Sequence, residues 1–417
     1  MGLRGNLKVP ADKSMSHRAV MFGALAKGQT KVHNILLSED VKTTIQAFQQ
    51  LGLTIQLKGS DMVIEGRDFT LTQPSEALDM GNSGTTTRLI MGILAAQNFD
   101  SELKGDPSLS KRPMNRVAIP LTVMGADIRA QGVKGTLPIH ITGKKLHPLD
   151  FEMPVASAQV KSALIFAALQ TAGKSKITEE VPSRNHTEQM LKAFGGTISI
   201  EGKKIIIEGP QHLRGTEMTI PGDISSAAFW IAAALITPDS DILLENVGVN
   251  PTRTGILDVV KAMGGKLELL NVDDLAQTAD IHVQYTETLK SVTISGDLIP
   301  RLIDEIPVIA LLATQAEGET LVKDAAELKV KESDRIIALV EMLRALGADA
   351  VPTEDGLIVQ GQSKLQGALV DSYGDHRLAM TAAIAGLIAD GEVQFAGGEM
   401  IATSYPNFYQ DMDKLCQ

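Results

Sequence analysis

One pattern recurs six times along the chain, and it limits the folds that these 417 residues can adopt. Each copy opens with a short polar loop and continues into a run of small and apolar residues. The copies follow one another at intervals of about 70 residues, which is longer than the repeats of helical solenoids. Each copy is therefore expected to be a unit of several secondary-structure elements. The six loops are Pro10–Ser14, Gly81–Thr85, Pro154–Gln159, Pro221–Ser226, Pro300–Glu305 and Tyr373–Arg377.

The apolar runs predict buried helices, because a helix that is hydrophobic on every side belongs in an interior. They cover residues 21–26, 89–96, 163–170, 227–236, 308–316 and 380–389. In most copies an alternating strand follows, and then an amphipathic helix that ends on a glycine, which is a common C-terminal cap. These glycines are Gly52, Gly125, Gly195, Gly264 and Gly347.

The length of the chain predicts two domains, because one hydrophobic core rarely serves more than about 250–300 residues. Three units in each half would place three buried helices behind a curved sheet, with the boundary near Pro221. If the units pack alike, the N-termini of the buried helices gather on one face of each half, and their positive dipole ends attract anions. Two halves that face each other through these ends would form a cleft for phosphate and carboxylate groups.

The charge balance restricts the partners of such a cleft. The chain has 39 Lys and Arg residues against 50 Asp and Glu, and its net charge of −11 disfavours nucleic acid and anionic lipid. An anionic ligand must then be held by a local cluster of cations. The single cysteine, Cys416, excludes an internal disulfide and a thiolate metal site. The first residues lack the apolar segment of a secretory signal, and no apolar run approaches the ~20 residues of a membrane span, so a cytoplasmic protein is expected.

Cations and hydroxyls in the loops are candidate ligands for anions. Lys13, Ser14 and Arg18 converge on one helix start, which is a typical phosphate-binding group, although Ser14 alone could be a helix N-cap and Lys13 a solvated charge. Arg112 precedes a proline that fixes the backbone beside it. Ser157, itself another potential N-cap, and Gln159 are uncharged and suit a polyhydroxylated ring.

Carboxylates stand beside cations in the second half of the chain. Asp304 and Glu305 lie at the start of an apolar helix expected over residues 303–315, where one of them could act as a general base or both could simply complement the helix dipole. The run Lys331–Arg335 precedes an amphipathic helix expected over residues 336–346. A solvated charge run would also explain it, as helix capping would explain Asp375–Arg377.

The motifs together resemble those of 5-enolpyruvylshikimate-3-phosphate synthases, over essentially the whole chain. The resemblance is carried by Lys13-Ser14 with Arg18, and by Lys111–Pro113, Lys331–Arg335 and Gly374–Arg377. Three further segments, Ser157–Lys161, Arg184–Glu188 and Asn250–Arg253, resemble markers of the class II branch, which is known for lower sensitivity to glyphosate.

The resemblance implies an inside-out α/β barrel with two similar domains, each of three βαβαββ units with buried helices and outer sheets. Residues 13–221 would form the first domain, and residues 1–12 with 222–417 the second, with crossings near residues 12–13 and 221–223. The domains would close on the substrates shikimate 3-phosphate and phosphoenolpyruvate. No cofactor or metal is implied, and a monomer is expected because the two halves form the site between themselves.

The resemblance also implies the residues of the site. The shikimate 3-phosphate contacts would be Lys13, Ser14, Arg18, Ser157, Gln159, Arg184, Asp304 and Lys331. The phosphoenolpyruvate contacts would be Lys13, Gly84, Arg112, Gln159, Arg335 and Arg377. Addition of a hydroxyl to phosphoenolpyruvate needs a base at the hydroxyl and an acid at the methylene carbon. Asp304 is the expected base, and Glu332 and Lys13 are expected to exchange the methylene proton.

Some positions depart from the family pattern. Ala11 replaces a class II glycine, and Ala158 replaces a second serine of many class I enzymes. Leu89 stands where many class I enzymes have proline, so inhibitor sensitivity does not follow from the sequence. The segment Thr403–Pro406 lacks the lysine that class I enzymes place there, which leaves a late cationic contact unassigned.

Three other functions compete with this interpretation. The enolpyruvyl transferase of cell-wall synthesis shares the six-unit fold, but its common form has a reactive cysteine in the loop that here reads Asp106–Arg112. An RNA 3′-terminal phosphate cyclase would use His376, but the acidic pI of 5.3 and the 4% aromatic content disfavour RNA binding. A scaffold that only binds anions would gain nothing from Asp304 and Glu332.

Overall fold

The computed structural model describes residues 2–416 and contains two compact units. Residues Ala11–Ile220 form one unit, called here the continuous unit. Residues Met1–Pro10 and Pro221–Gln417 form the other, called the discontinuous unit. The expected crossings near residues 12–13 and 221–223 differ from these bounds by one to three residues. Each unit has its own hydrophobic core.

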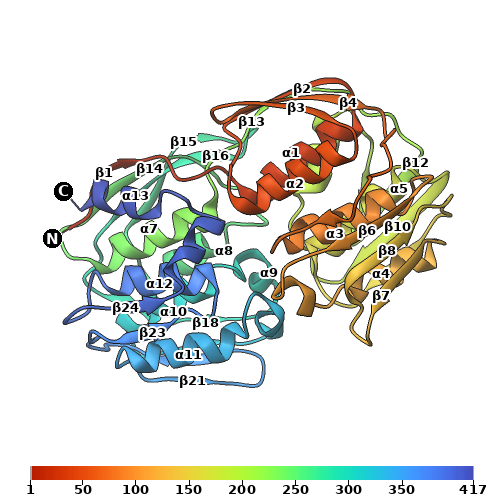
Figure 1. Ribbon diagram of the computed structural model, residues 1–417. Helices are drawn as coiled ribbons and strands as arrows, with labels where there is room; N and C mark the ends of the chain where they lie inside the picture. The colour runs from red at the N-terminus through yellow and green to blue at the C-terminus, as the bar shows by residue number, and fades with distance from the viewer. Residues whose placement is uncertain (1, 417) are drawn as a thin grey trace. The chain divides into compact units, whose positions relative to one another are not determined.

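The continuous unit contains three four-stranded sheets with the same topology (Figure 1). In each sheet the first strand is parallel to the second. The third strand is antiparallel to the second, and the fourth is antiparallel to the third. The first sheet has the order β13 (Glu217–Thr219), β2 (Lys27–His33), β4 (Asp61–Arg67), β3 (Thr54–Lys58). The second has the order β5 (Leu78–Asp79), β6 (Asp100–Lys104), β8 (Thr136–Thr142), β7 (Asp127–Gln131). The third has the order β9 (Asp150–Met153), β10 (Gly173–Glu179), β12 (Lys204–Gly209), β11 (Ser199–Glu201).

The discontinuous unit repeats this topology twice. One sheet has the order β1 (Arg4–Leu7), β14 (Asp241–Gly248), β16 (Thr278–Gln284), β15 (Leu267–Asp273). Another has the order β18 (Thr293–Ile294), β20 (Glu319–Val322), β22 (Leu357–Gln360), β21 (Ala350–Pro352), and the short strands β17 (Leu289–Lys290) and β19 (Ala316–Glu317) pair separately.

The sixth unit is shorter than expected. Strands β23 (Leu369–Asp371) and β24 (Gln394–Ala396) form a parallel pair. After β24, the described residues form the 3-10 helix η4 (Gly398–Thr403) and helix α13 (Phe408–Leu415), and no pair of strands follows among them. The described residues of this last unit therefore follow the βαβα part of the βαβαββ order without the final two strands, and α13 stands where the other units have their amphipathic helix.

The six apolar runs form buried helices, as predicted. In the continuous unit they are α1 (Lys13–Leu25), α3 (Gly84–Leu94) and α5 (Ala158–Ala168). In the discontinuous unit they are α7 (Ile224–Ile236), α10 (Ile306–Gln315) and α12 (His376–Ala385). All residues of α7 are buried, which agrees with its apolar sequence. Helices α3 and α5 pack so closely that a Cβ on Gly92 would lie 1.9 Å from the Ala163 carbonyl oxygen.

The amphipathic helices are α2 (Glu39–Gln50), α4 (Asn115–Val123), α6 (His186–Ala193), α8 (Gly255–Ala262) and α11 (Arg335–Ala345). A glycine with positive φ follows each of them, so the predicted glycine caps are confirmed. The helix expected over residues 303–315 begins later, at Ile306. A short helix, α9 (Ile299–Leu302), precedes it, and Ile303–Glu305 form a turn between the two. Pro307 lies in the first turn of α10, where a missing backbone N–H costs nothing.

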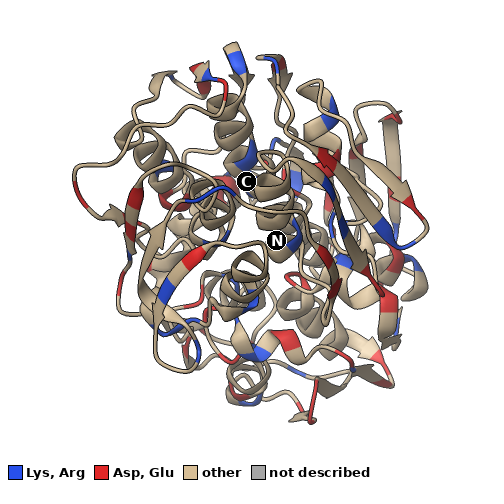
Figure 2. Ribbon diagram, turned by 90° about the vertical axis from the view of Figure 1, so that its right-hand side faces the viewer, with Lys and Arg blue, Asp and Glu red and all other residues tan. Residues whose placement is uncertain are grey.

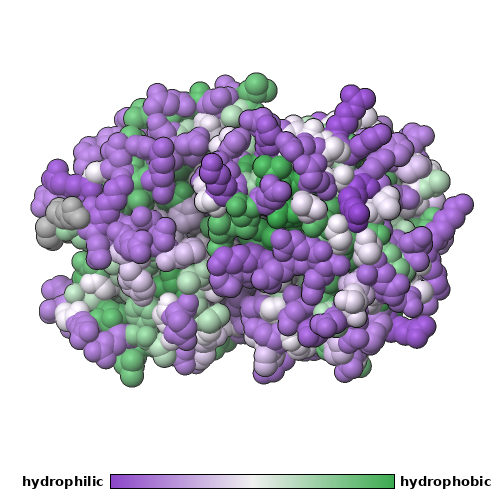
Figure 3. All heavy atoms as spheres, turned by 45° about the horizontal axis from the view of Figure 1, so that its top comes forward, coloured by the Kyte–Doolittle hydropathy of each residue, from purple (hydrophilic) through white to green (hydrophobic). Residues whose placement is uncertain are grey.

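Charged residues of both signs alternate along the outer strands and helices rather than forming blocks of one sign (Figure 2). The face drawn in Figure 3 is largely hydrophilic, and its most extensive hydrophobic area lies near the middle of the view. Among the described residues, no helix combines the length and the hydrophobicity needed to cross a membrane.

Candidate active site

The polar loops supply the N-cap residues of the buried helices. Asp12 accepts a hydrogen bond from the Met15 backbone N–H at 2.8 Å, and Ser83 accepts one from Thr86 at 3.2 Å. Ser157 is the N-cap of α5, as its alternative interpretation predicted. Ser14 is not an N-cap, because Asp12 has that role and Ser14 lies within the first turn of α1.

Lys13 and Arg18 project from the first two turns of α1. The Lys13 Nζ atom lies 3.1 Å from Asp40 Oδ2, a carboxylate in the first turn of α2. Arg18 is only 3% exposed and donates to the hydroxyls of Thr187 and Ser162, both at 2.7 Å. It also donates to the backbone oxygen of Ser14. Arg18 thus links α1, α5 and α6, while Lys13 lies at the start of α1.

The N-terminus of α3 brings two guanidinium groups close to one glycine. A Cβ on Gly84 would lie 2.9 Å from Arg88 Nη1 and 3.4 Å from Arg112 Nη1, so a side chain here would crowd both arginines. Arg112 donates to Asn82 Oδ1 at 2.7 Å. Arg88 donates to Gln159 Oε1 at 2.8 Å. Gly84, Arg112 and Gln159 therefore belong to one cluster, called here the α3 cluster.

Arg88 and Asn82 are members of the α3 cluster that the sequence analysis did not select. Arg88 lies four residues after Gly84 on α3, so both face the same side of the helix. This spacing was the available signal for Arg88. Nothing in the spacing of Asn82 relates it to Arg112, which is 30 residues further along the chain.

Arg184 lies in a loop that a buried ion cluster holds. Lys161 is 1% exposed, and its Nζ atom lies 2.9 Å from Glu179 and 2.7 Å from Glu188. It also donates to the backbone oxygen of Ser183, next to Arg184. Lys161 and Glu188 belong to two separate segments that resemble class II markers, and their ion pair connects α5 with α6.

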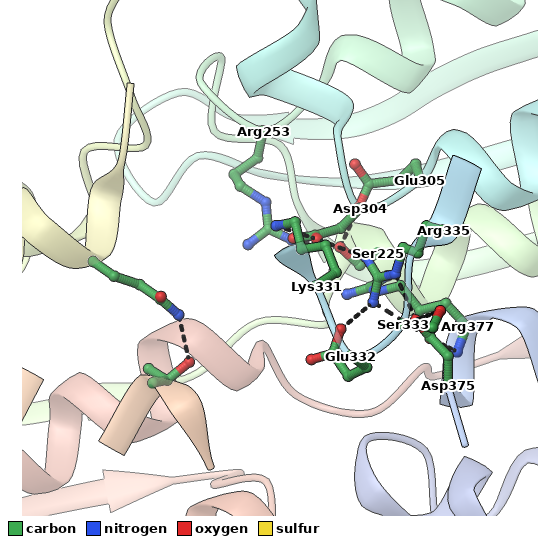
Figure 4. Close-up of polar contacts among 12 residues, drawn as sticks. Ser225, Arg253, Asp304, Glu305, Lys331, Glu332, Ser333, Arg335, Asp375 and Arg377 are labelled. Atoms are coloured by element: carbon green, nitrogen blue, oxygen red, sulfur yellow. Dashed lines mark hydrogen bonds and ion pairs between the residues drawn. The ribbon is translucent and has the colours of Figure 1, made fainter. Parts of the chain in front are cut away.

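In the discontinuous unit, Arg335 connects three carboxylates (Figure 4). Its Nε donates to Asp375 at 2.7 Å, its Nη1 to Asp304 at 3.2 Å, and its Nη2 to Glu332 at 2.6 Å. Burial alone lowers the pKa of Arg335, but these carboxylates outweigh burial and raise its pKa above the ordinary value. Arg335 therefore remains a cation, although its side chain is 1% exposed.

Asp304 receives a second cation, because Lys331 Nζ lies 3.2 Å from the same Oδ1 atom that Arg335 contacts. Arg377 follows Asp375 at the start of α12, and its backbone N–H donates to Asp375 at 2.9 Å. Asp304, Lys331, Glu332, Arg335 and Arg377 therefore gather around one point, which we call the Arg335 cluster. Asp375 also contacts Arg335, but from the sequence it was considered only as a possible helix cap and as part of the motif Gly374–Arg377, not as a site residue.

A buried histidine adjoins Lys13. His17 is 0% exposed, and its Nδ1 lies 2.6 Å from the hydroxyl of Thr44. Burial, together with the charges of Lys13 and Arg18, holds the pKa of His17 well below its ordinary value. The imidazole is therefore neutral near pH 7, so Lys13 and Arg18 supply the positive charge of this helix start.

The described residues contain no group of three or more His, Cys, Asp or Glu side chains placed to hold a metal ion. The thirteen residues selected from the sequence divide between the units. Lys13, Ser14, Arg18, Gly84, Arg112, Ser157, Gln159 and Arg184 belong to the continuous unit, and the other five form the Arg335 cluster.

Known proteins resemble this chain along its whole length. The family model of EPSP synthase (3-phosphoshikimate 1-carboxyvinyltransferase) matches residues 1–412. A curated 3-phosphoshikimate 1-carboxyvinyltransferase of Streptococcus equi subsp. zooepidemicus is 55% identical over 416 residues, which cover 99% of this chain and 97% of the relative. A relative of the same name from Streptococcus thermophilus is also 55% identical, over 417 residues, with the same coverage.

Solved structures agree with these matches. An EPSP synthase from Acinetobacter baumannii superimposes with a TM-score of 0.88 and 45% identity, covering 99% of this chain and 96% of that one. The enolpyruvyl transferase NikO from Streptomyces tendae has a TM-score of 0.81 at 16% identity, which concerns the fold alone. The sequence and structure comparisons lead to the same result: the chain belongs to the EPSP synthase (3-phosphoshikimate 1-carboxyvinyltransferase) family.

Proposed function

We propose that this enzyme transfers the enolpyruvyl group of phosphoenolpyruvate to the 5-hydroxyl of shikimate 3-phosphate and releases phosphate, a step of aromatic amino acid biosynthesis on the route to chorismate. The observation that carries the proposal is the Arg335 cluster, where carboxylates and cations lie within hydrogen-bond distance of one another. Proton transfer requires the carboxylates, and two anionic substrates require the cations.

The reaction proceeds by addition and then elimination. Asp304 accepts the proton of the 5-hydroxyl while the hydroxyl oxygen attacks C2 of phosphoenolpyruvate, and C3 receives a proton from the acid. The resulting tetrahedral intermediate loses phosphate as C3 gives a proton back. Glu332 and Lys13 exchange the proton at C3. The arginines stabilise the negative charge of the intermediate, because their positions are fixed before the substrates bind.

The two substrates use overlapping sets of residues. Shikimate 3-phosphate contacts Lys13, Ser14, Arg18, Ser157, Gln159, Arg184, Asp304 and Lys331. Phosphoenolpyruvate contacts Lys13, Gly84, Arg112, Gln159, Arg335 and Arg377. The α3 cluster supports the second assignment, since Gly84 leaves room between Arg88 and Arg112 for a small anion. Each of the two sets includes residues from both units.

The finer classification follows from the motifs. We assign the enzyme to the class II branch and its fold to the inside-out α/β barrel. The buried pair of Lys161 and Glu188 supports the class assignment, because it gives two marker segments a common structural role. The enzyme acts as a monomer in the cytoplasm, and it requires neither a metal nor an organic cofactor.

Phosphate release tests the proposed function. Purified enzyme is given phosphoenolpyruvate with shikimate 3-phosphate, and in a parallel assay with a uridine-diphospho amino sugar. Turnover is expected only with shikimate 3-phosphate, and turnover only with the amino sugar would overturn the assignment.

Asp304→Ala tests the role of the base. Turnover is expected to be abolished, while binding of shikimate 3-phosphate, measured by calorimetry, stays largely intact. Full activity of this variant would remove Asp304 from the mechanism.

A further inference from the structure

Beside the Arg335 cluster lies a second buried polar group that the proposed reaction does not use. It consists of Asp223, Ser225, Arg253 and Glu305, which come from the start of α7, the loop before α8 and the turn before α10. Figure 4 labels Ser225, Arg253 and Glu305. All four residues are buried, and none is more than 6% exposed. We call these four residues the Ser225 bridge, because the Ser225 hydroxyl joins Arg253 to Glu305.

The hydrogen bonds of the bridge run from a cation to a carboxyl group. Arg253 Nη2 donates to Asp223 Oδ1 at 2.9 Å and to Ser225 Oγ at 2.7 Å. Ser225 Oγ in turn donates to Glu305 Oε1. The other carboxyl oxygen of Glu305, Oε2, is buried and has no hydrogen-bond partner among the described residues. Ser225 therefore anchors this carboxyl group, and a buried carboxyl group without a hydrogen-bond partner is costly.

The anchor acts on the residue next to Glu305, which is Asp304. Glu305 is the N-cap of α10, but its side chain makes no capping bond to that helix and reaches α7 instead. Its backbone N–H donates to Leu302 at 2.8 Å, and its backbone oxygen accepts from Ile309 at 3.0 Å. Glu305 is thus held at its side chain and at both backbone groups, which fixes the Cα position and direction of Asp304.

We propose that the Ser225 bridge is a positioning device that sets the place of Asp304 for proton transfer. The inference rests on the proposed role of Asp304. Lys331 and Arg335 hold the carboxylate of Asp304 from one side, and the bridge holds its backbone from the other. Loss of the bridge leaves the substrate-binding cations in place and moves only the base.

The test compares two alanine variants in the same turn of α7. Ser225→Ala removes the hydroxyl that joins Arg253 to Glu305, and Ser226→Ala makes the same chemical change one residue further along. Because displacements near 1 Å can cost about 100-fold in rate, kcat of Ser225→Ala is expected to fall at least about tenfold. The KM values of both substrates are expected to stay within about twofold, and Ser226→Ala is expected to keep its kcat within about twofold of the unchanged enzyme.

The outcomes separate the inference from the proposed function. The positioning role of the Ser225 bridge is overturned if Ser225→Ala leaves kcat unchanged, whether or not KM rises. A loss of thermal stability without a loss of kcat overturns it as well. Asp304→Ala is assayed in parallel: if it stays active, the proposed function of Asp304 fails whatever Ser225→Ala does. Should Ser225→Ala not fold, Ser225→Cys fills the same space with a weak donor. The same kcat-selective loss, of at least about threefold, is expected for it, and an unchanged kcat again overturns the inference.

Discussion

A single guanidinium group organises the carboxylates of the discontinuous unit. Arg335 bonds to Asp304, Glu332 and Asp375 through three different nitrogen atoms. The planar guanidinium group of arginine can donate hydrogen bonds in three directions at once, whereas the lysine ammonium group concentrates its charge at one point on a flexible side chain. The identity of residue 335 therefore matters beyond its charge.

Arg335→Lys is expected to lower kcat/KM for phosphoenolpyruvate by about 30-fold or more, since about 2 kcal/mol is the lower end of the cost of truncating one partner of a buried charge pair at a binding site. Steady-state kinetics with varied phosphoenolpyruvate measures this loss. Lys329→Arg, which changes an exposed cation in the preceding 3-10 helix, is the control and should change neither kinetics nor stability. Kinetics of Arg335→Lys close to those of the unchanged enzyme would show that charge alone suffices at this position.

His17 makes the stability of the protein depend on pH. Its pKa in the folded state lies well below the ordinary 6.5, so the unfolded state binds a proton that the folded state does not. The free energy of unfolding should therefore fall as the pH decreases through about 6.5, and the loss should continue down to the folded-state pKa of His17. Urea unfolding between pH 7.5 and 5 measures this slope.

The matched variant is His17→Asn, which keeps a polar atom near Thr44 but does not titrate. Its stability should depend less steeply on pH than that of the unchanged protein. Equal slopes for the two proteins would assign the acid sensitivity to other groups.

The sequence suggested candidate site residues but not the residues that contact them. Lys13 was selected because it converges with Ser14 and Arg18 on one helix start, and Arg112 because a proline follows it, whereas Arg335 was assigned from the family resemblance. Their carboxylate and amide partners are far away in the sequence: Asp40 follows Lys13 by 27 residues, and Asp375 follows Arg335 by 40. Such pairs depend on how helices pack, and neither helical nor strand periodicity specifies that packing.

At the scale of elements, hydrophobicity identified the buried helices but not all of their ends. The apolar runs on α7 and α10 left no alternative to burial. The start of α10 was predicted three residues too early, because Ile303 continues the apolar pattern while Pro307 fits the first turn of a helix that begins at Ile306. The close approach of α3 to α5 also had only one sequence signal, a glycine within the apolar run.

That approach makes Gly92 intolerant of a side chain. Gly92→Ala places a methyl group 1.9 Å from a backbone oxygen of α5, which cannot move without shifting the helix. The free energy of unfolding is expected to fall by about 1–3 kcal/mol. This net value already includes the ~1 kcal/mol by which alanine stabilises a helix relative to glycine. Urea denaturation gives this difference.

The comparison variant for Gly92→Ala is Gly23→Ala in α1. There the new methyl group meets the Cδ1 atom of Ile64 at 2.8 Å, the end of a flexible side chain that can rotate away. Its loss of stability should be clearly smaller. A larger loss for Gly23→Ala than for Gly92→Ala would mean that helix packing does not limit substitution at Gly92.

At the scale of the whole molecule, the two units differ in the number of chain segments that form them: one segment forms the continuous unit, and two form the discontinuous unit. Every strand of the three sheets in the continuous unit lies within residues 27–219. The discontinuous unit takes β1 from the first residues, and Leu3, Leu7 and Val9 are part of its core. The length and the six-fold pattern predicted two halves, but the assignment of residues 1–12 came from the family resemblance, since no local pattern in β1 reveals its partner β14.

Separate fragments test this difference. Residues 11–220 alone are expected to unfold cooperatively in urea, because their sheets and core are complete. Residues 221–417 alone lack the edge strand β1 and three core side chains, so a broad transition or aggregation is expected. The Pro10 oxygen accepts a hydrogen bond from the Asp223 backbone N–H at 2.8 Å, so a short Gly-Ser linker can join residues 1–10 directly to residue 221. This joined fragment should regain a cooperative transition, and equal midpoints with and without residues 1–10 would show that β1 contributes nothing to the stability of the unit.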